Sequence, residues 1–184
     1  RTAAVKDVCY DGFEGGAVSE RTAGFHKGAI CLDFSALYPS IINQLNMSIE
    51  TIGGKDYKLG NGVSFAKEPI GVIPQVVTKL LEERKRYKKL RGKKGNPDYE
   101  VYDSLQTICK FLCNSVFGAV CFPGFRLFRK EIGESITWTG RELIGTTIGA
   151  MKSLGYTIIM SDTDSVVVLA QEKDHNSSED RGGK

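Results

Sequence analysis

Three aspartates stand where the sequence pattern predicts the ends of strands. Asp33 lies in the apolar run 29–34, and Asp162 and Asp164 separate the apolar runs 156–160 and 166–170. If these elements are neighbours in one sheet the carboxylates converge, and two carboxylates ~4 Å apart repel by about 4 kcal/mol at an effective dielectric near 20 unless a cation bridges them. Oxygen ligands of this kind suit Mg²⁺. The plainer alternative is that Asp162 and Asp164 are turn residues and that Asp33 caps the next helix.

Positive charge is concentrated in residues 79–95, which hold nine basic and two acidic residues and carry a net charge of +7, against +3 for the whole chain. An otherwise acidic chain with one basic segment suits a polyanionic partner held near a cation-binding centre. A solvated helix face is the plainer explanation of such a run. The basic residues are Lys79, Arg84, Lys85, Arg86, Lys88, Lys89, Arg91, Lys93 and Lys94.

The basic segment belongs to a predicted pair of helices. Apolar residues at helical spacing between Ile73 and Leu81 continue on the same face as Arg84, Lys88 and Arg91. Residues 92–97 contain Gly, Asn and Pro and predict a turn, after which a second helical pattern covers residues 99–117. The sequence therefore predicts an antiparallel helical hairpin. The predicted apolar side of its second helix consists of Leu105, Ile108, Cys109, Leu112 and Val116.

The remaining pattern predicts a mixed α+β fold. Residues 29–34 are predicted as a strand, Pro39 marks the first turn of a helix, and residues 131–153 form a long helix that Gly155 ends. Residues 156–160 and 166–170 form a strand hairpin with residues 161–165 at its tip. The polar tail 171–184 is predicted to lack fixed structure.

Composition narrows the class of protein. The 184 residues are 41% hydrophobic and 26% charged, which excludes a disordered chain, a collagen-like fibre and a histone-like protein. No apolar run approaches the ~18 residues that a membrane span needs, so no membrane partner is expected. Five cysteines without a C-x-x-C pair, and only two histidines, disfavour a zinc site. They indicate small buried thiols in a reducing, intracellular compartment.

Three segments resemble the motifs of family B DNA polymerases. Residues 33–40 (DFSALYPS) resemble motif A, D-x-x-S-L-Y-P-S, and residues 110–118 (KFLCNSVFG) resemble motif B, K-x-x-x-N-S-x-Y-G. Residues 161–165 (SDTDS) resemble motif C, Y-G-D-T-D-S. The resemblance runs from about Phe13 to Ala170 in the family's order, and no P-loop or kinase-type glycine loop is present.

The resemblance implies metal-dependent chemistry at the acids. Asp33 and Asp164, with the backbone carbonyl of Phe34, would hold two Mg²⁺ ions, and Asp162 would support the primer end and the metals less directly. One ion would lower the pKa of the primer 3′-hydroxyl and the other would neutralise the leaving pyrophosphate.

The resemblance also implies phosphate contacts. Arg84, Lys88 and Lys110 would clamp the β- and γ-phosphates, and Lys110 would in addition donate a proton to pyrophosphate. The backbone amides of Ser35, Ala36 and Leu37 would cradle the same phosphates.

Sugar and base contacts follow from the same resemblance. Tyr38 would lie under the deoxyribose and exclude a 2′-hydroxyl, and Asn114 and Phe117 would line the nascent base pair. Ala36 departs from the motif A serine, and Phe117 and Met160 stand where the family usually has tyrosine. These departures concern fidelity and primer contacts rather than the type of reaction.

By resemblance, the chain is a palm interrupted by fingers: palm 1–69, fingers hairpin 70–118, palm 119–170 and tail 171–184. We expect the exonuclease and the thumb to be absent from it, and activity of the piece alone is left open. Primer–template DNA and deoxynucleoside triphosphates are the expected partners, and a sliding clamp for the parent polymerase is not readable from the sequence.

Two alternatives differ in what they explain. Another palm-type nucleotidyltransferase would share the aspartates but would not predict Tyr38-Pro39-Ser40 after Asp33. A non-catalytic DNA-binding module would explain the basic segment and leave the three aspartates unexplained.

Overall fold

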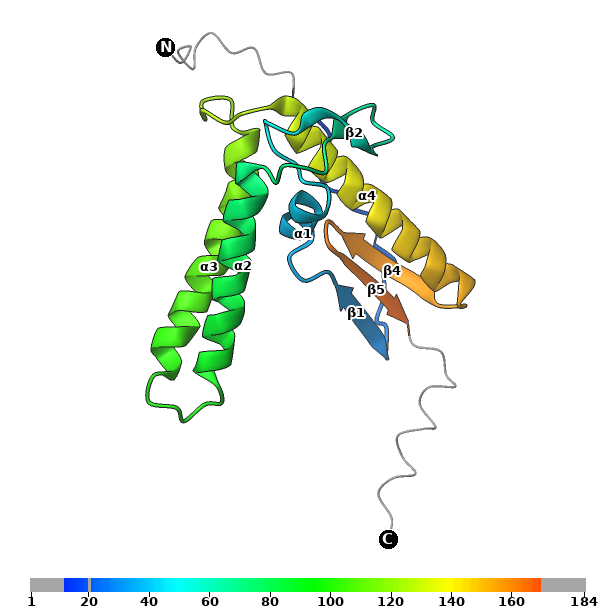
Figure 1. Ribbon diagram of the computed structural model, residues 1–184. Helices are drawn as coiled ribbons and strands as arrows, with labels where there is room; N and C mark the ends of the chain where they lie inside the picture. Colours follow the sequence, from blue (N-terminus) through cyan, green and yellow to red (C-terminus); the bar gives the residue numbers. More distant parts are fainter. Residues whose placement is uncertain (1–11, 20, 170–184) are drawn as a thin grey trace. The chain divides into compact units, whose positions relative to one another are not determined.

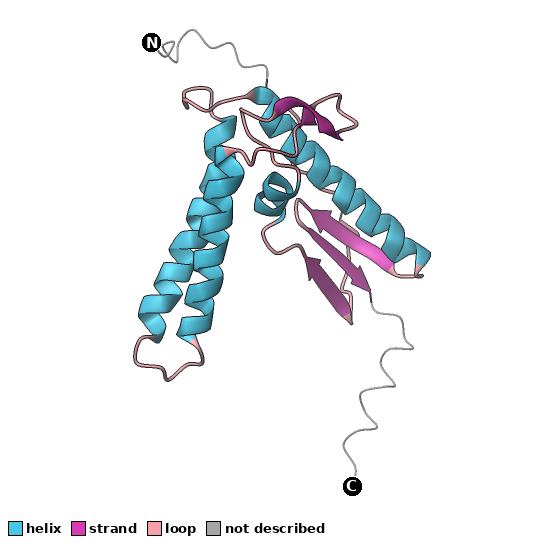
Figure 2. Cartoon of the chain, viewed as in Figure 1, coloured by secondary structure: helices cyan, strands magenta, loops and turns pink. Residues whose placement is uncertain are grey.

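The computed structural model describes residues 12–19 and 21–169 of the chain (Figure 1). The elements in chain order are β1 (Ala29–Asp33), α1 (Leu37–Gln44), β2 (Ile52–Lys58), β3 (Ser64–Phe65), α2 (Val72–Arg91), α3 (Tyr99–Cys121), α4 (Lys130–Ser153), β4 (Thr157–Asp162) and β5 (Ser165–Leu169). This is the mixed α/β architecture with small antiparallel sheets that the sequence predicts (Figure 2).

The chain divides into two compact units. We call residues 1–14 and 36–137 the helical unit, and residues 15–35 and 138–184 the sheet unit. One boundary falls at the start of α1 and the other within α4, between Thr137 and Trp138. The division into palm and fingers stays a prediction.

The sheet unit is built on three antiparallel strands in the order β1-β5-β4. Val166 and Val168 of β5 are buried against Ile144 of α4, because alternate residues of the central strand face the helix. The core is completed by the partly buried Phe34, Ile148, Met151, Tyr156 and Ile158. On the outer side of β4, the N–H groups of Ser19 and Thr22 donate to the carbonyls of Ser161 and Ile159 at 3.0 Å.

The helical unit contains α1, the hairpin of α2 and α3, the small sheet β2-β3 and the first two turns of α4. Its fully buried apolar side chains come from the helices, the small sheet and the loop after α1: Ile42, Met47, Phe65, Val77, Val120, Ile132 and Ile136. The sequence analysis missed β2 and β3. Gly53, Gly54 and the exposed Asp56 interrupt the apolar alternation that marks a strand.

The predicted helical hairpin is present, with α2 and α3 side by side and antiparallel (Figure 1). The turn begins at Gly92, whose φ of 61° favours glycine. The predicted apolar side of α3 is wrong in part, because Cys109, Cys113 and Val120 are the buried residues. Ile108 and Leu112 are 51% and 49% exposed. Its main packing partner is α2, with fewer contacts to α1, so one narrow face is buried.

The strand hairpin is also present, with a shorter turn than predicted. Thr163 and Asp164 form the turn, so Asp164 lies at the tip as predicted. Asp162 is instead the last residue of β4. The second strand ends at Leu169, and Ala170 and the tail 171–184 lie outside the described residues.

Two expectations from composition need correction. By length and composition α3 could cross a membrane, with a mean hydropathy of 1.2 over its best window, although helices of protein cores pass the same test. Cys109 and Cys113 are buried thiols as expected, whereas Cys31 is exposed. Burial raises the pKa of the Cys121 thiol to about 11.

Candidate active site

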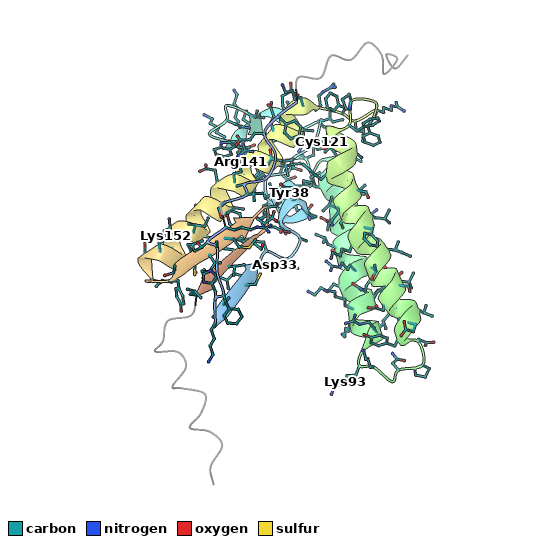
Figure 3. All side chains as sticks on the ribbon, turned by 180° about the vertical axis from the view of Figure 1, so that it is seen from behind. Asp33, Tyr38, Lys93, Cys121, Arg141 and Lys152 are labelled. Atoms are coloured by element: carbon teal, nitrogen blue, oxygen red, sulfur yellow. The ribbon has the colours of Figure 1, made fainter. Side chains whose placement is uncertain are left out.

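Two of the three aspartates are brought into one row by the register of the sheet. Ser165, the first residue of β5, pairs with Asp33 of β1 on one side and with Asp162 of β4 on the other. Directly paired residues of neighbouring strands project to the same face. Asp33, Ser165 and Asp162 therefore face away from α4, because the next residue, Val166, is buried on the α4 side. Figure 3 labels Asp33 at the end of β1.

Asp164 is fixed beside this row by its backbone. Its carbonyl accepts a hydrogen bond of 2.8 Å from the N–H of Phe34, the residue after Asp33. The turn is also attached to the segment before β1, because the N–H of Thr163 donates to the carbonyl of Ala17 at 2.8 Å. We call Asp33, Asp162 and Asp164 the acid edge.

The side chains of the acid edge carry oxygen donors, the ligand type that Mg²⁺ prefers. Asp33 is exposed and Asp162 and Asp164 are half-buried, so all three side chains are at least partly accessible to solvent. Oxygen donors from two or three carboxylates leave room for water and phosphate ligands, as Mg²⁺ requires. Within residues 12–19 and 21–169, no three or more His, Cys, Asp and Glu side chains are arranged so that they could hold a metal ion, the three aspartates of the acid edge included.

The suggestion that Asp33 caps α1 is contradicted. Ala36 occupies the N-cap position, and no side chain makes a capping hydrogen bond there. Ala36 has φ 57° and ψ 51°, the left-handed region that a residue with a Cβ seldom adopts. The carbonyl of Ala36 accepts a hydrogen bond from the N–H of Ser40 at 3.0 Å, and α1 begins with this bond. The N–H groups of Leu37 and Tyr38 lie before this bond in the chain, at the N-terminal end of α1 where an anion is favoured.

Tyr38 and Phe117 are in direct contact within the helical unit. Their ring centroids are 4.6 Å apart with an angle of 45° between the planes. Tyr38 is on α1, where Figure 3 labels it, and Phe117 is on α3. The sequence analysis assigns these residues to the sugar and the base separately, and nothing in their spacing predicts that the rings touch.

Three cations of the hairpin lie close enough to repel one another. Arg84 and Lys88 are one turn apart on α2, and Lys110 is on α3. The pKa of Lys88 is lowered, chiefly by repulsion from Arg84 and then by burial, Arg91 and Lys110. We call Arg84, Lys88 and Lys110 the cationic face.

The charges of this face are only partly compensated by the protein. Arg91 is paired with Asp103 of α3, but within the described residues no carboxylate forms an ion pair with Arg84, Lys88 or Lys110. The Nε of Arg84 is buried and makes no hydrogen bond. Mutual repulsion and an unused buried donor both favour binding of an anion. Asn114 is exposed one turn beyond Lys110.

The structure thus groups the predicted site residues into two sets. Asp33, Phe34, Ser35 and the two motif C aspartates belong to the sheet unit. The start of α1, with Ala36, Leu37 and Tyr38, and the cationic face belong to the helical unit. Ser165 was predicted as part of motif C, but its place between Asp33 and Asp162 follows only from the strand register.

Comparison with known proteins places the chain among polymerases. Residues 2–184 match the family model described as DNA polymerase family B. The chain is 32% identical over 180 residues to DNA polymerase 1 of Pyrococcus abyssi, covering 95% of this chain and 23% of that protein. It is 31% identical over 167 residues to the DNA polymerase alpha catalytic subunit of Xenopus laevis, covering 85% of this chain and 12% of that protein.

A solved structure gives the same result. The family B DNA polymerase of the hyperthermophilic archaeon Pyrobaculum calidifontis matches with a TM-score of 0.74 and 28% identity, over 92% of this chain and 24% of that one. The chain therefore spans less than a quarter of the length of each of these three proteins. With the family model matching nearly every residue, the chain belongs to DNA polymerase family B.

Proposed function

We propose that this chain carries the catalytic acids and the nucleotide-binding helices of a DNA-directed DNA polymerase. The reaction is attack of a primer 3′-hydroxyl on the α-phosphate of a deoxynucleoside triphosphate, with release of pyrophosphate. The single observation that carries the proposal is the register that puts Asp33 and Asp162 on either side of Ser165, with Asp164 held beside them. In a family B DNA polymerase, aspartates arranged in this way are expected to bind the metal ions of nucleotidyl transfer.

At the acid edge, Asp33 and Asp164 bind two divalent cations together with the backbone carbonyl of Phe34. The chemistry that bound Mg²⁺ supplies is activation of the hydroxyl and neutralisation of charge on the phosphates. The protein's part is to hold the carboxylates at a fixed separation, which the ladder bonds of β1, β5 and β4 support. Asp162 orients the primer end from the same face.

On the cationic face, Arg84, Lys88 and Lys110 bind the β- and γ-phosphates. The lowered pKa of Lys88 and the unpaired Nε of Arg84 support this role, since an anion relieves both the repulsion and the unsatisfied donor. Lys110 also serves as the acid that protonates pyrophosphate. The backbone N–H groups around residues 35–37, at the start of α1, add contacts to the same phosphates.

The pair of rings forms the floor under the sugar and the base. The ring of Tyr38 excludes a 2′-hydroxyl by its volume. The ring of Phe117, whose centroid is 4.6 Å from that of Tyr38, supports the tyrosine ring and faces the nascent base pair. Asn114, exposed on the same helix, contributes a polar side chain beside it.

In this proposal, residues 1–69 and 119–170 form the palm and residues 70–118 the fingers. Primer–template DNA and deoxynucleoside triphosphates are the substrates, and exonuclease, thumb and a sliding clamp belong to the complete polymerase. A non-catalytic DNA-binding module is not favoured, because it gives the acid edge no role.

Single-turnover primer extension by the full-length protein tests the proposal. With Mg²⁺ and a DNA template we expect extension with deoxynucleotides and very little with ribonucleotides, and Asp33→Asn should abolish it. DNA binding without extension would support the binding-module alternative instead. Efficient ribonucleotide addition, or a preference for an RNA template, would place the chain with another class of palm-type nucleotidyltransferase.

A further inference from the structure

The segment that leads into α2 is held by a single buried side chain. Asn46, which is 2% exposed, follows α1. Its Nδ2 donates to the carbonyls of Ala66, Lys67 and Pro69 at 2.9, 3.1 and 2.9 Å, and its Oδ1 accepts from the N–H of Gly71 at 2.8 Å. One amide thereby engages four of the six residues that immediately precede α2, and both its donor and its acceptor groups are used.

The backbone of Asn46 is fixed as well. Its φ of 48° is in the left-handed region, which Asn tolerates better than most residues. Its carbonyl accepts a hydrogen bond from the hydroxyl of Thr51, and this hydroxyl in turn accepts from the N–H of Ser48 at 3.0 Å. The side chain of Asn46 is therefore presented from a rigid loop.

The first N–H groups of α2 are satisfied by the same loop. The N-cap Gly71 has no side chain to offer, and Glu50 Oε1 accepts from the N–H of Val72 at 3.1 Å. Ser48 Oγ accepts from the N–H of Ile73 at 3.4 Å. A Cβ on Gly71 would come within 2.3 Å of the Cβ of Ser48, so the helix end is seated directly on the loop. We call Asn46, Ser48, Glu50 and Thr51 the clamp.

The clamp joins the two helices that carry the nucleotide contacts proposed above. It follows α1, which bears Tyr38, and it seats the first turn of α2, which bears Arg84 and Lys88. Arg84 is about 18 Å along the helix axis from Val72, at 1.5 Å per residue. A tilt of ~10° at the root of α2 therefore moves Arg84 by roughly 3 Å, and displacements of about 1 Å in a reacting complex can cost two orders of magnitude in rate.

We propose that Asn46 is a positioning residue, which fixes the root of α2 against α1 and so sets the separation between Tyr38 and the cationic face. This role rests on the proposed function. Asn46 touches no substrate in this assignment and acts only through Arg84, Lys88 and Tyr38. The clamp thus determines whether the cationic face can bind the triphosphate while Tyr38 contacts the sugar of the same nucleotide.

The test uses Asn46→Asp in the full-length protein. The substitution preserves size but replaces two N–H donors by an oxygen that faces three carbonyls. At temperatures well below unfolding we expect the KM for the correct deoxynucleotide to rise at least tenfold. Discrimination between deoxy- and ribonucleotides should fall several-fold, and primer–template affinity should not change.

Asn61→Asp is the matched control. The side-chain amide of Asn61 also donates and accepts within the helical unit. Its Nδ2 donates to Ser135 Oγ at 3.2 Å, and its Oδ1 accepts from the N–H of Val63 at 3.2 Å. Neither hydrogen bond involves the segment before α2. It should lower the melting temperature while KM and sugar discrimination stay as in the wild type.

If Asn46→Asp does not fold, Ser48→Ala is the second variant, since it removes only the contacts of one hydroxyl with Glu50 and Ile73. It should raise KM two- to fivefold. A wild-type enzyme that extends primers, with Asn46→Asp or Ser48→Ala lowering only the melting temperature, overturns the positioning role and leaves the proposed function standing. A wild-type protein that binds primer–template but never extends it overturns the proposed function, and the positioning role with it.

Discussion

The acid edge and the cationic face are held in place by different kinds of interaction. The aspartates sit at strand ends whose positions are set by ladder hydrogen bonds and by the bond from Phe34 N–H to the Asp164 carbonyl. Arg84, Lys88 and Lys110 sit on two helices that pack along one narrow face, and within the described residues none of the three forms an ion pair. A backbone ladder therefore fixes the strand ends that carry the acids, whereas the cations extend on long side chains from helices whose orientation depends on packing and on the clamp.

In the proposed function, the difference corresponds to what each set binds: metal ions at the acid edge and a triphosphate at the cationic face. Metal ligation tolerates only small changes in oxygen position, which suits a paired backbone. A triphosphate is longer and more flexible, and cations on long side chains can adapt to it. Substitutions at the acid edge should therefore remove the chemistry and leave folding intact. Substitutions at the cationic face should change affinity in a graded way.

The largest effect is expected from Asp33→Asn and Asp164→Asn. Loss of a carboxylate from a two-metal site should lower the rate of incorporation roughly a thousandfold or more, which is about 4 kcal/mol of transition-state stabilisation. The melting temperature should stay the same or rise, because repulsion between carboxylates is relieved. Single-turnover extension and thermal unfolding on the same samples check both statements.

Glu142→Gln is the control for these variants, since Glu142 is an exposed acid on α4 and should leave the rate unchanged. Near-normal extension by either aspartate variant would contradict the proposal that Asp33 and Asp164 bind the metal ions. A large loss of stability would show that the carboxylates, and not the backbone ladder, hold the strand ends.

The next effect is expected at the cationic face. Arg84→Ala, Lys88→Ala and Lys110→Ala should each raise the KM for deoxynucleotides roughly tenfold to a hundredfold, since charge-assisted hydrogen bonds contribute about 1.5–3 kcal/mol. Primer–template affinity and its salt dependence should not change. Lys89→Ala, on another face of α2, should leave KM unaltered. If these cations bind duplex phosphates instead, the salt slope of DNA affinity falls by about one for each lost contact.

Tyr38 distinguishes sugar selection from simple packing. Tyr38→Val should open space beside Phe117 and lower the preference for deoxynucleotides over ribonucleotides by about tenfold, equivalent to ~1.4 kcal/mol. Tyr38→Phe keeps the ring contact and should behave like the wild type. An unchanged preference in Tyr38→Val together with a lower melting temperature would mean that the ring serves only the core.

A smaller effect is expected from Phe117→Tyr, which restores the hydroxyl usual in the family. One added hydrogen bond contributes ~0.5–1.5 kcal/mol, so misinsertion should fall by less than about tenfold with correct insertion nearly constant. Since Phe117 is half-buried against Tyr38, a hydroxyl that faces the protein would find no partner. Unchanged selectivity with a lowered melting temperature would refute a role for this residue at the base pair.

The smallest effect concerns stability at low pH. The hydroxyl of Ser48, with help from the N–H of Val72, holds the pKa of Glu50 below its ordinary value despite partial burial. Such a carboxylate stabilises the fold above its unfolded pKa and loses that contribution as the pH falls through its folded pKa. Glu50→Gln should therefore lower the melting temperature near pH 7 and match the wild type in strong acid. Glu82→Gln, an exposed acid on α2, should show no such convergence.

Strongly periodic elements could be predicted from the sequence, and contacts between distant residues could not. The α2–α3 hairpin, the long helix α4 and the β4–β5 hairpin follow from apolar spacing and from Gly and Pro signals. The predicted apolar side of α3 failed at Ile108 and Leu112, because amphipathicity does not reveal how few neighbours a helix has. β2 was missed because Gly53 and Gly54 interrupt its pattern.

At the candidate site, the motifs identified the residue types but not their arrangement. The place of Asp162 beside Ser165, and so in a row with Asp33, depends on strand register. The contact of Tyr38 with Phe117 joins helices far apart in the chain. The clamp was missed altogether, because a single Asn after a helix carries no periodic signal and its partners begin 20 residues later.

The pairing of β1 with β5 also imposes an order on folding. The β4–β5 hairpin and the α2–α3 hairpin are closed by short turns, whereas the ladder that sets Asp33 beside Ser165 joins residues more than a hundred positions apart. Closing so long a loop is entropically costly, and such contacts form late. During synthesis, the strand that carries Asp33 leaves the ribosome before β5 and pairs with it only once β5 has followed. Asp33 and the two motif C aspartates therefore come together only after the sequence between them has been made.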